Sequence, residues 1–243
     1  FSPIPARVVP APVKVPVLDS RKIQPRQFTV QKGSDLAKFH VYMNGQNAQL
    51  QSALSIAPAL YTMQPSGTLY KSMVETGIST AVQSTTWLDQ DFNLVFMGAI
   101  YAPNHDAKKV DQALTTGVEN SQPFTDAELQ RVKNMTKNAA DTIAKDAVAL
   151  GSRLSDYAVA SHGQWDQYFK DLQAIQDLKL NDANQILKQF LVSSHRISGD
   201  ILPTPEDQKK AMTQNTQEKP KTLDQSAEKA EPLKDASVYK QEV

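Results

Sequence analysis

The sequence predicts an α+β fold with two layers, in which helices cover one face of a mostly antiparallel sheet. Segments with alternating apolar and polar residues come in neighbouring pairs, and helical patterns come in runs between those pairs. The resulting order, β, β, α, α, β, β, α, α, α, α, β, lacks the regular strand–helix alternation that builds a parallel sheet. The two chain ends differ in composition from the middle, which places the folded domain at residues 26–205.

The ends of the chain are predicted to lie outside this domain. Six of the 14 prolines fall within residues 1–25. Proline fixes φ and removes a backbone donor, so this stretch is interpreted as an extended interdomain linker, with a disordered arm as the alternative. Residues 206–243 contain no Ile, Phe or Trp. Such a segment cannot bury enough apolar surface to offset its ordering entropy, which predicts a disordered or linker tail.

Two strand pairs are expected. Phe28 and Val30 alternate with polar residues, and after a turn at 33–35 the alternation resumes from Ala37 through Phe39 to Met43. This pattern predicts a β-hairpin with its apolar face on the core. The second pair is expected at 79–87 and 92–101. Because both faces of 92–101 are apolar, this segment is predicted to be a central strand.

The helices follow from periodicity and capping signals. Pro58 is expected to kink or divide the first helix, and Ser66 to cap the second. Asp106 is a predicted N-cap, and Thr125 with Glu128 forms a capping box that opens a long helix. The expected helical segments are 50–57, 68–75, 107–118, 126–150 with a continuation to 158, 165–172 and 181–191. A final strand is expected at 195–202.

Composition excludes several classes of function. Lys+Arg and Asp+Glu both number 26, so a nucleic-acid binder that works by neutralising phosphates is not expected. No apolar run is long enough to span a membrane. The absence of cysteine removes thiol nucleophiles and Cys-type metal sites, and fits a cytoplasm or a periplasm equally well. The start at Phe1 shows no signal peptide and is typical of the middle of a longer protein.

Catalytic motifs are absent from the sequence. The four histidines, His40, His105, His162 and His195, form no H-E-x-x-H or H-x-x-E-H pair. No nucleophile elbow and no phosphate-binding P-loop occurs. We therefore expect no catalytic residue, no metal ligand and no cofactor in this chain. The Pro65–Gly67 junction precedes a helix and is a candidate site for an anion or a peptide carboxylate, with simple capping as the competing interpretation.

Five segments, in the same order, resemble one known family. Residues 65–75, PSGTLYKSMVE, are similar to the "PSGRLYKALVE" helix of the pitrilysin/insulinase-type (inverzincin) zinc metallopeptidases. The other four segments resemble the "FGPIP" entry to the interdomain linker, a strand before a helix, the "T-x-x-E-L-x-R-x-K" start of a long helix, and the last helix with its "G-x-x-x-P" strand. They are 1–5, 92–103, 124–133 and 180–203.

This resemblance implies a non-catalytic domain of a zinc peptidase. Family members are built from repeated α+β units that close around a peptide, and the zinc site belongs to the first unit. Zinc is thus expected in an upstream domain of the same polypeptide or in a partner subunit, and this chain alone is expected to be inactive. The implied role is to close the chamber and bind peptide substrate. A periplasmic location is expected, with cytoplasmic and mitochondrial locations as alternatives.

The chain departs from the family pattern at two positions. Some partner units carry an Arg in the "S-x-R-L" helix and a Tyr shortly after it, and these bind the substrate carbonyl. Thr occupies both positions here. The alternative implication is an inactive structural or interaction subunit, like the core and processing-peptidase subunits of this fold. The candidate substrate-binding residues are Ser66, Gly67, Thr68 and Thr80.

Overall fold

The computed structural model describes residues 26–31, 36–45, 47–88, 92–161 and 163–207 of the 243. The expected linker at 1–25, the turn at 33–35 and all but the first two residues of the expected tail at 206–243 lie outside these ranges. The domain boundaries expected from composition therefore remain predictions.

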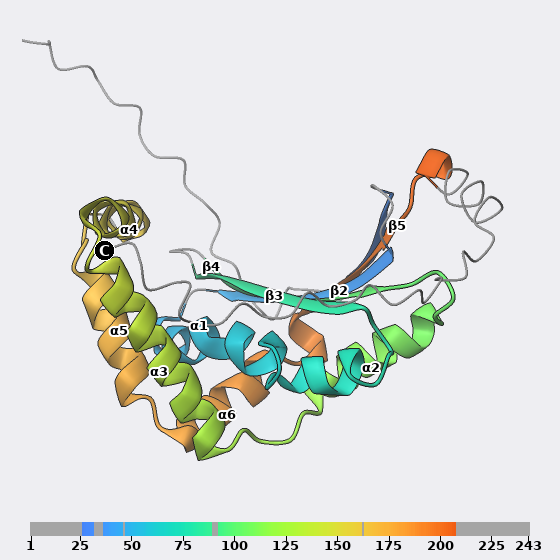
Figure 1. Cartoon of the computed structure of the whole chain (residues 1–243), viewed down its shortest axis with the longest axis horizontal. Coiled ribbons are helices and arrows are strands. Elements are labelled where there is room, and N and C mark those ends of the chain that lie inside the picture. The colour runs from blue at the N-terminus through green and yellow to red at the C-terminus, as the bar shows by residue number, and fades with distance from the viewer. Residues whose placement is uncertain (1–25, 32–35, 46, 89–91, 162, 208–243) are drawn as a thin grey trace, which may run out of the picture. The chain divides into compact units, whose positions relative to one another are not determined.

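A five-stranded mixed sheet forms one layer of the domain (Figure 1). The strand order is β1-β5-β2-β4-β3, and every neighbouring pair is antiparallel except β1 and β5. The predicted α+β fold with a mostly antiparallel sheet is confirmed, and β4 is a central strand as expected. The strands are β1 Arg26–Gln31, β2 Leu36–Gly45, β3 Ala81–Leu88, β4 Phe92–Tyr101 and β5 Arg196–Leu202.

The predicted hairpin between the first two strands is wrong. β5, from the far end of the domain, lies between β1 and β2: Phe28 pairs with Gly199, and Gly199 pairs in turn with Phe39. β1 and β2 alternate in the same way as a hairpin pair does. Alternation fixes which residues share a face, but it carries no information about which strand comes next in the sheet.

Helices form the second layer, and α1, α2 and α6 lie along one face of the sheet (Figure 1). The predicted caps are confirmed: Asp106 accepts from the Lys108 N–H, and Thr125 and Glu128 form a reciprocal capping box. The helical elements are α1 Ala48–Thr62, the π-helical η2 Tyr70–Val74, α2 Ala107–Glu119, α3 Asp126–Ile143, α4 Ala147–Ala160, α5 Gln167–Asp177, α6 Leu180–Phe190 and the short η3 Ser193–His195.

Three helix predictions need correction. The long helix is two helices, because Asp146 caps a new one by accepting from the Val148 and Ala149 N–H groups. Pro58 does not divide the first helix, which continues to Thr62, and the Pro58 carbonyl accepts from the Thr62 hydroxyl; the expected kink remains a prediction. The segment after Ser66 is π-helical over Tyr70–Val74, and its N-cap is Leu69, with no side-chain cap; Ser66 is not the cap.

The hydrophobic core lies between the sheet and the helices. Its largest fully buried side chains include Leu54, Tyr61, Met97, Leu114 and Phe190. On β2 the Tyr42 side chain belongs to this core and Leu36 packs against it, and His40 is also completely buried. The apolar side of the Phe39–Met43 alternation lies on the opposite face of the sheet, not on this core as expected, although Ala37 and Phe39 are buried there.

A polar network makes the helix-covered side of β2 compatible with burial. The Tyr42 hydroxyl donates to Glu119 on α2 at 3.1 Å, and Arg196 on β5 donates to the same carboxylate oxygen. The His40 Nε2 lies 3.0 Å from the Asp111 carboxylate, also on α2. Polar groups in a low-dielectric environment require such partners, so α2 is held on the sheet by hydrogen bonds as well as by apolar contact.

Asp111 should make the stability of the domain sensitive to acid. The His40 hydrogen bond, opposed by burial and aided by the positive charges of Lys38 and Arg196, lowers the pKa of Asp111 below its ordinary value. The contribution of ionised Asp111 to folding stability is therefore fully present above the pKa of the unfolded chain, near 4. This contribution is lost as the pH falls through the lower pKa of the folded state.

Denaturant midpoints measured between pH 7 and pH 2 should fall less steeply in Asp111→Asn than in the wild type. The same substitution at exposed Asp141 should leave the slope unchanged; equal slopes in both variants would contradict this assignment.

Candidate functional site

The second face of the sheet is strongly apolar, and we call it the open sheet face because no helix of the described ranges covers it (Figure 1). The pairing register places alternate residues of all five strands on this face. None of the described helices lies over it (Figure 1). The residues with side chains on this face include Phe28, Val30, Phe39, Val41, Met43, Trp87, Phe92, Leu94, Phe96, Ile100, Ile197 and Ile201.

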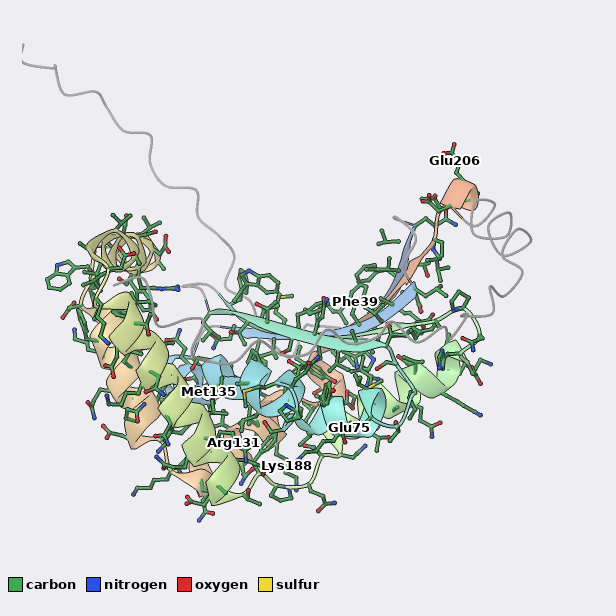
Figure 2. The ribbon with its side chains drawn as sticks, viewed as in Figure 1. Phe39, Glu75, Arg131, Met135, Lys188 and Glu206 are labelled. Atoms are coloured by element: carbon green, nitrogen blue, oxygen red, sulfur yellow. The ribbon has the colours of Figure 1, made fainter. Side chains whose placement is uncertain are left out.

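An aromatic row crosses the open face. Figure 2 shows Phe39 on this side of the sheet. The ring of Phe39 lies 5.3 Å from that of Phe28 and 5.7 Å from that of Phe96, centroid to centroid. Gly199 makes this arrangement fit, because a Cβ there would lie 2.2 Å from Cζ of Phe39. A glycine beneath an aromatic ring lets the ring lie flat on the backbone of the neighbouring strand.

Both edges of this face expose large apolar side chains. Phe28 is 42 % exposed and Val30 40 % on β1, and Trp87 is 53 % exposed on β3. A contiguous apolar surface of this kind is typical of a protein–protein or ligand contact. We therefore take the open sheet face, defined by the residues named above, as the principal candidate binding surface.

The predicted site residues in the Pro65–Thr68 loop have structural roles as well. Gly67 is buried, its N–H donates to the Met63 carbonyl at 2.6 Å, and a Cβ there would lie 2.6 Å from the Tyr61 carbonyl oxygen. This loop therefore packs directly on the end of α1. Ser66 is half-buried and lines a groove against α3, described below.

The hydroxyls of Thr68 and Thr80 do not form an exposed pair that could bind a substrate together. The Thr68 Oγ1 is buried and has no hydrogen-bond partner within the described residues. Thr80 is exposed, but its hydroxyl donates to the Ile100 carbonyl at 3.0 Å. Neither side chain has the reach or the charge of the Arg and Tyr that the family pattern would place there.

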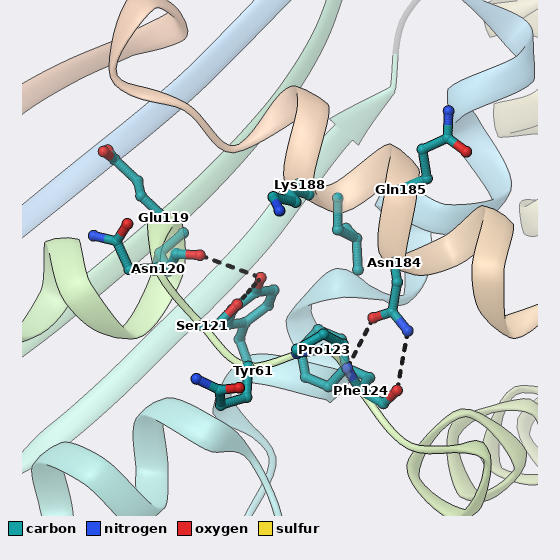
Figure 3. A pocket seen from close by; sticks show the side chains of 12 residues that line it. Tyr61, Glu119, Asn120, Ser121, Pro123, Phe124, Asn184, Gln185 and Lys188 are labelled. Atoms are coloured by element: carbon teal, nitrogen blue, oxygen red, sulfur yellow. Dashed lines mark hydrogen bonds between the residues drawn. The ribbon is translucent and has the colours of Figure 1, made fainter.

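A pocket of about 560 Å³ lies on the helical side, where the α2–α3 connection meets α1 and α6 (Figure 3). The Tyr61 hydroxyl contacts Ser121, at 3.2 Å, and Asn184 exchanges two hydrogen bonds with the Phe124 backbone. Lys188 contributes an exposed ammonium at its rim. The Tyr61, Ser121 and Asn184 side chains are already paired, so donors and acceptors for a ligand come from exposed side chains of the lining such as Lys188. Sequence analysis gave no indication of it.

The described residues contain no group of three or more histidine, aspartate or glutamate side chains able to hold a metal ion. None of the described helices has the length and apolar character needed to cross a bilayer.

Comparison with solved structures identifies this architecture. No family model and no curated protein matches the chain. The inactive peptidase domain of a protein assigned as a zinc protease, from Bordetella parapertussis, is 29 % identical, with a TM-score of 0.65 over 72 % of this chain and 96 % of that one. A protein from Bordetella pertussis Tohama I with the same assignment is 28 % identical, with a TM-score of 0.61 over 69 % of this chain and 94 % of that one.

The M16 inactive domain from Pseudomonas fluorescens shares the fold at 12 % identity, with a TM-score of 0.57 over 74 % of this chain and 44 % of that one. The chain is thus similar in fold to α+β domains of zinc proteases. Among such domains, the chain resembles the non-catalytic ones, as the sequence motifs had indicated. The expected resemblance to the pitrilysin/insulinase-type metallopeptidases is confirmed.

Proposed function

We propose that this chain is the non-catalytic, chamber-closing and peptide-binding domain of a zinc metalloendopeptidase. The zinc ion and the hydrolytic step belong to an upstream domain of the same polypeptide or to a partner subunit. The open sheet face carries the proposal, because an apolar surface spanning five strands requires a partner to cover it.

The chemistry of this face suits an extended peptide held against a second domain. Side chains of an extended chain point alternately to opposite sides, so every second residue of a peptide can contact the sheet. Phe28, at one end of the aromatic row, is 42 % exposed and offers apolar contact, whereas Phe39 is buried between its neighbours and supports the row from within. In this arrangement the chain binds and orients peptide and excludes water from it, while the zinc domain supplies the Lewis acid.

The comparisons support a place within a larger protease. The periplasmic protease PqqL from Escherichia coli shares the fold at 12 % identity, with a TM-score of 0.53. The match covers 75 % of the present chain and 21 % of PqqL. We propose a periplasmic location on this basis; the cytoplasm and the mitochondrion are the alternatives.

A structural subunit of the same fold is the second candidate. The threonines at 68 and 80 favour it, since one hydroxyl is buried and the other is bonded to a backbone carbonyl. A domain without the carbonyl-binding pair can still close a chamber, with the pair supplied elsewhere, or can serve assembly alone.

Charge placed on the open face should impair the protease that contains this domain. We expect Val30→Lys and Trp87→Lys each to lower kcat/KM for a quenched fluorescent peptide at least tenfold, because a lysine buried against a partner lacks a counter-charge. Chelator-sensitive cleavage by the zinc-loaded assembly is the measurement.

The matched control is Val148→Lys on α4, where the wild-type side chain is 83 % exposed and lies away from the sheet. This variant should cleave at the wild-type rate. Equal losses at positions 30 and 148 would contradict the assignment of the open face. A zinc-loaded wild-type assembly that cleaves no member of a diverse peptide library would favour the structural subunit instead.

A further inference from the structure

A second surface, on the helical side, combines positive charge with flexible apolar side chains. A groove of about 420 Å³ runs between the loop after α1 and the first turns of α3. Lys71 and Arg131 line it together with Met63 and Met135. Figure 2 shows Arg131 and Met135 along α3, and their i,i+4 spacing places them on one side of that helix. We call these four residues, with Pro65 and Ser66, the α3 groove.

The charges of Lys71 and Arg131 lower the pKa of the Glu128 carboxylate, which already accepts hydrogen bonds from Thr125. Burial alone would raise the pKa of Glu128, but hydrogen bonds from the Thr125 backbone and hydroxyl, with the charges of Lys71 and Arg131, lower it. Both Thr125 hydrogen bonds end on the same oxygen, Oε2, each at 2.8 Å. Oε2 of Glu128 is thus engaged in the capping box, and Glu128 forms no salt bridge with either cation.

Lys71 and Arg131 therefore remain available to a ligand. Both side chains are exposed, and within the described ranges neither forms a salt bridge. The Glu128 carboxylate, whose pKa both cations lower, offsets part of their mutual repulsion without forming a salt bridge to either. A ligand carboxylate placed between the two cations would accept charge-assisted hydrogen bonds from both.

The walls of the α3 groove are fixed before any ligand arrives. Gly67 packs on the backbone at the end of α1, which holds the loop, and the Thr125–Glu128 capping box holds the start of α3. Binding to a preformed groove loses less conformational entropy. The two methionines at its sides are flexible and polarisable, so they adapt to apolar side chains of different shape.

We propose that the α3 groove binds an acidic segment of a peptide, with a Glu or Asp side chain between Lys71 and Arg131 and an adjacent apolar residue between Met63 and Met135. The carboxylate in this proposal belongs to a side chain within the peptide and not to the end of the chain. This site lies on the helical side and does not depend on the role proposed for the open sheet face.

Calorimetric titration of the full 243-residue chain tests the proposal. The probe is the acetylated and amidated peptide Gly-Ala-Met-Glu-Ala-Gly, compared with its Gln counterpart and with a Gln peptide that has a free C-terminus. We expect the Glu peptide to bind at least tenfold more tightly than either, with an affinity that falls as salt is raised.

Substitutions then locate the site. Arg131→Gln and Lys71→Gln should each weaken binding of the Glu peptide at least fivefold, without changing the thermal midpoint, because both wild-type side chains are exposed. The matched control, Lys188→Gln, removes an exposed lysine at the rim of the other pocket and should bind as the wild type does. Absence of binding, equal binding of the Gln peptide, tighter binding of the free C-terminus, or an equal loss in Lys188→Gln would each overturn the proposal.

Discussion

Gly67→Ala is expected to destabilise the domain by about 3 kcal/mol, through overpacking against backbone. An ideal Cβ at this position would lie 2.6 Å from the Tyr61 carbonyl oxygen, 2.7 Å from the Met63 nitrogen and 2.8 Å from the Thr62 nitrogen. No side-chain rotation relieves these contacts, since all three atoms belong to the backbone at the end of α1. The loop that carries Ser66 must therefore move away from α1.

Gly151→Ala is the matched control, with an effect of opposite sign. A Cβ at Gly151 meets nothing within 4 Å, and the residue lies inside α4. Alanine there should stabilise the domain by about 0.5–1 kcal/mol, because glycine loses more backbone entropy when it enters a helix. Chemical denaturation of both variants at neutral pH measures the difference. A Gly67→Ala variant as stable as the wild type would show that the loop is not held against α1.

The helices and strands could be predicted from the sequence more reliably than the order in which the strands pair in the sheet. The capping box at Thr125 was identified because both of its hydrogen bonds are made within four residues. The pairing of β1 with β5 joins residues far apart in the chain, such as Phe28 and Gly199, and no local pattern encodes it. Local interactions fix local structure, whereas strand order depends on the packing of the whole chain.

The choice of core face failed for a related reason. On β2, the alternation of Phe39 and Val41 with Lys38 and His40 favours the apolar residues as the core face. The structure places His40 on the helix-covered face, where α2 supplies Asp111 as its partner, and leaves Phe39 buried on the other face. The burial of a polar residue can be predicted only when its hydrogen-bond partner is known, and the partner of His40 lies 71 positions away in the sequence.

The candidate sites were only partly accessible from sequence. Ser66 was singled out and does line a groove, but Arg131 and Met135 come from an ordinary-looking helix surface. Nothing in their spacing distinguishes them from any exposed helical pair. The open sheet face had one signal, the apolar character of both sides of the strand at 92–101, which was used to predict a central strand and not a binding surface.

Glu119→Leu is expected to destabilise the domain by about 3 kcal/mol, because it leaves the Arg196 charge without its partner. The side chains of Glu119 and Arg196 are only 12 % and 22 % exposed. Glu119 also accepts the Tyr42 hydroxyl, which has no access to solvent. The substitution thus removes two hydrogen bonds and leaves a guanidinium mostly out of water, between α2 and the sheet.

Arg196→Met should be destabilising by a similar amount, since it leaves the carboxylate mostly buried without a counter-charge. The double variant, Glu119→Leu with Arg196→Met, removes both charges and should be more stable than the sum of the single changes indicates, by about 2 kcal/mol. A double-mutant cycle from urea denaturation at pH 7 gives this coupling energy.

Tyr42→Phe, which keeps the ion pair and loses one donor, should be less stable than the wild type by only about 1 kcal/mol. Additive single changes would mean that the pair, although close, does not hold α2 on the sheet. A strong coupling would show that the polar face of β2, which alternation alone assigned to solvent, is part of what fixes the helical layer and leaves the apolar face open.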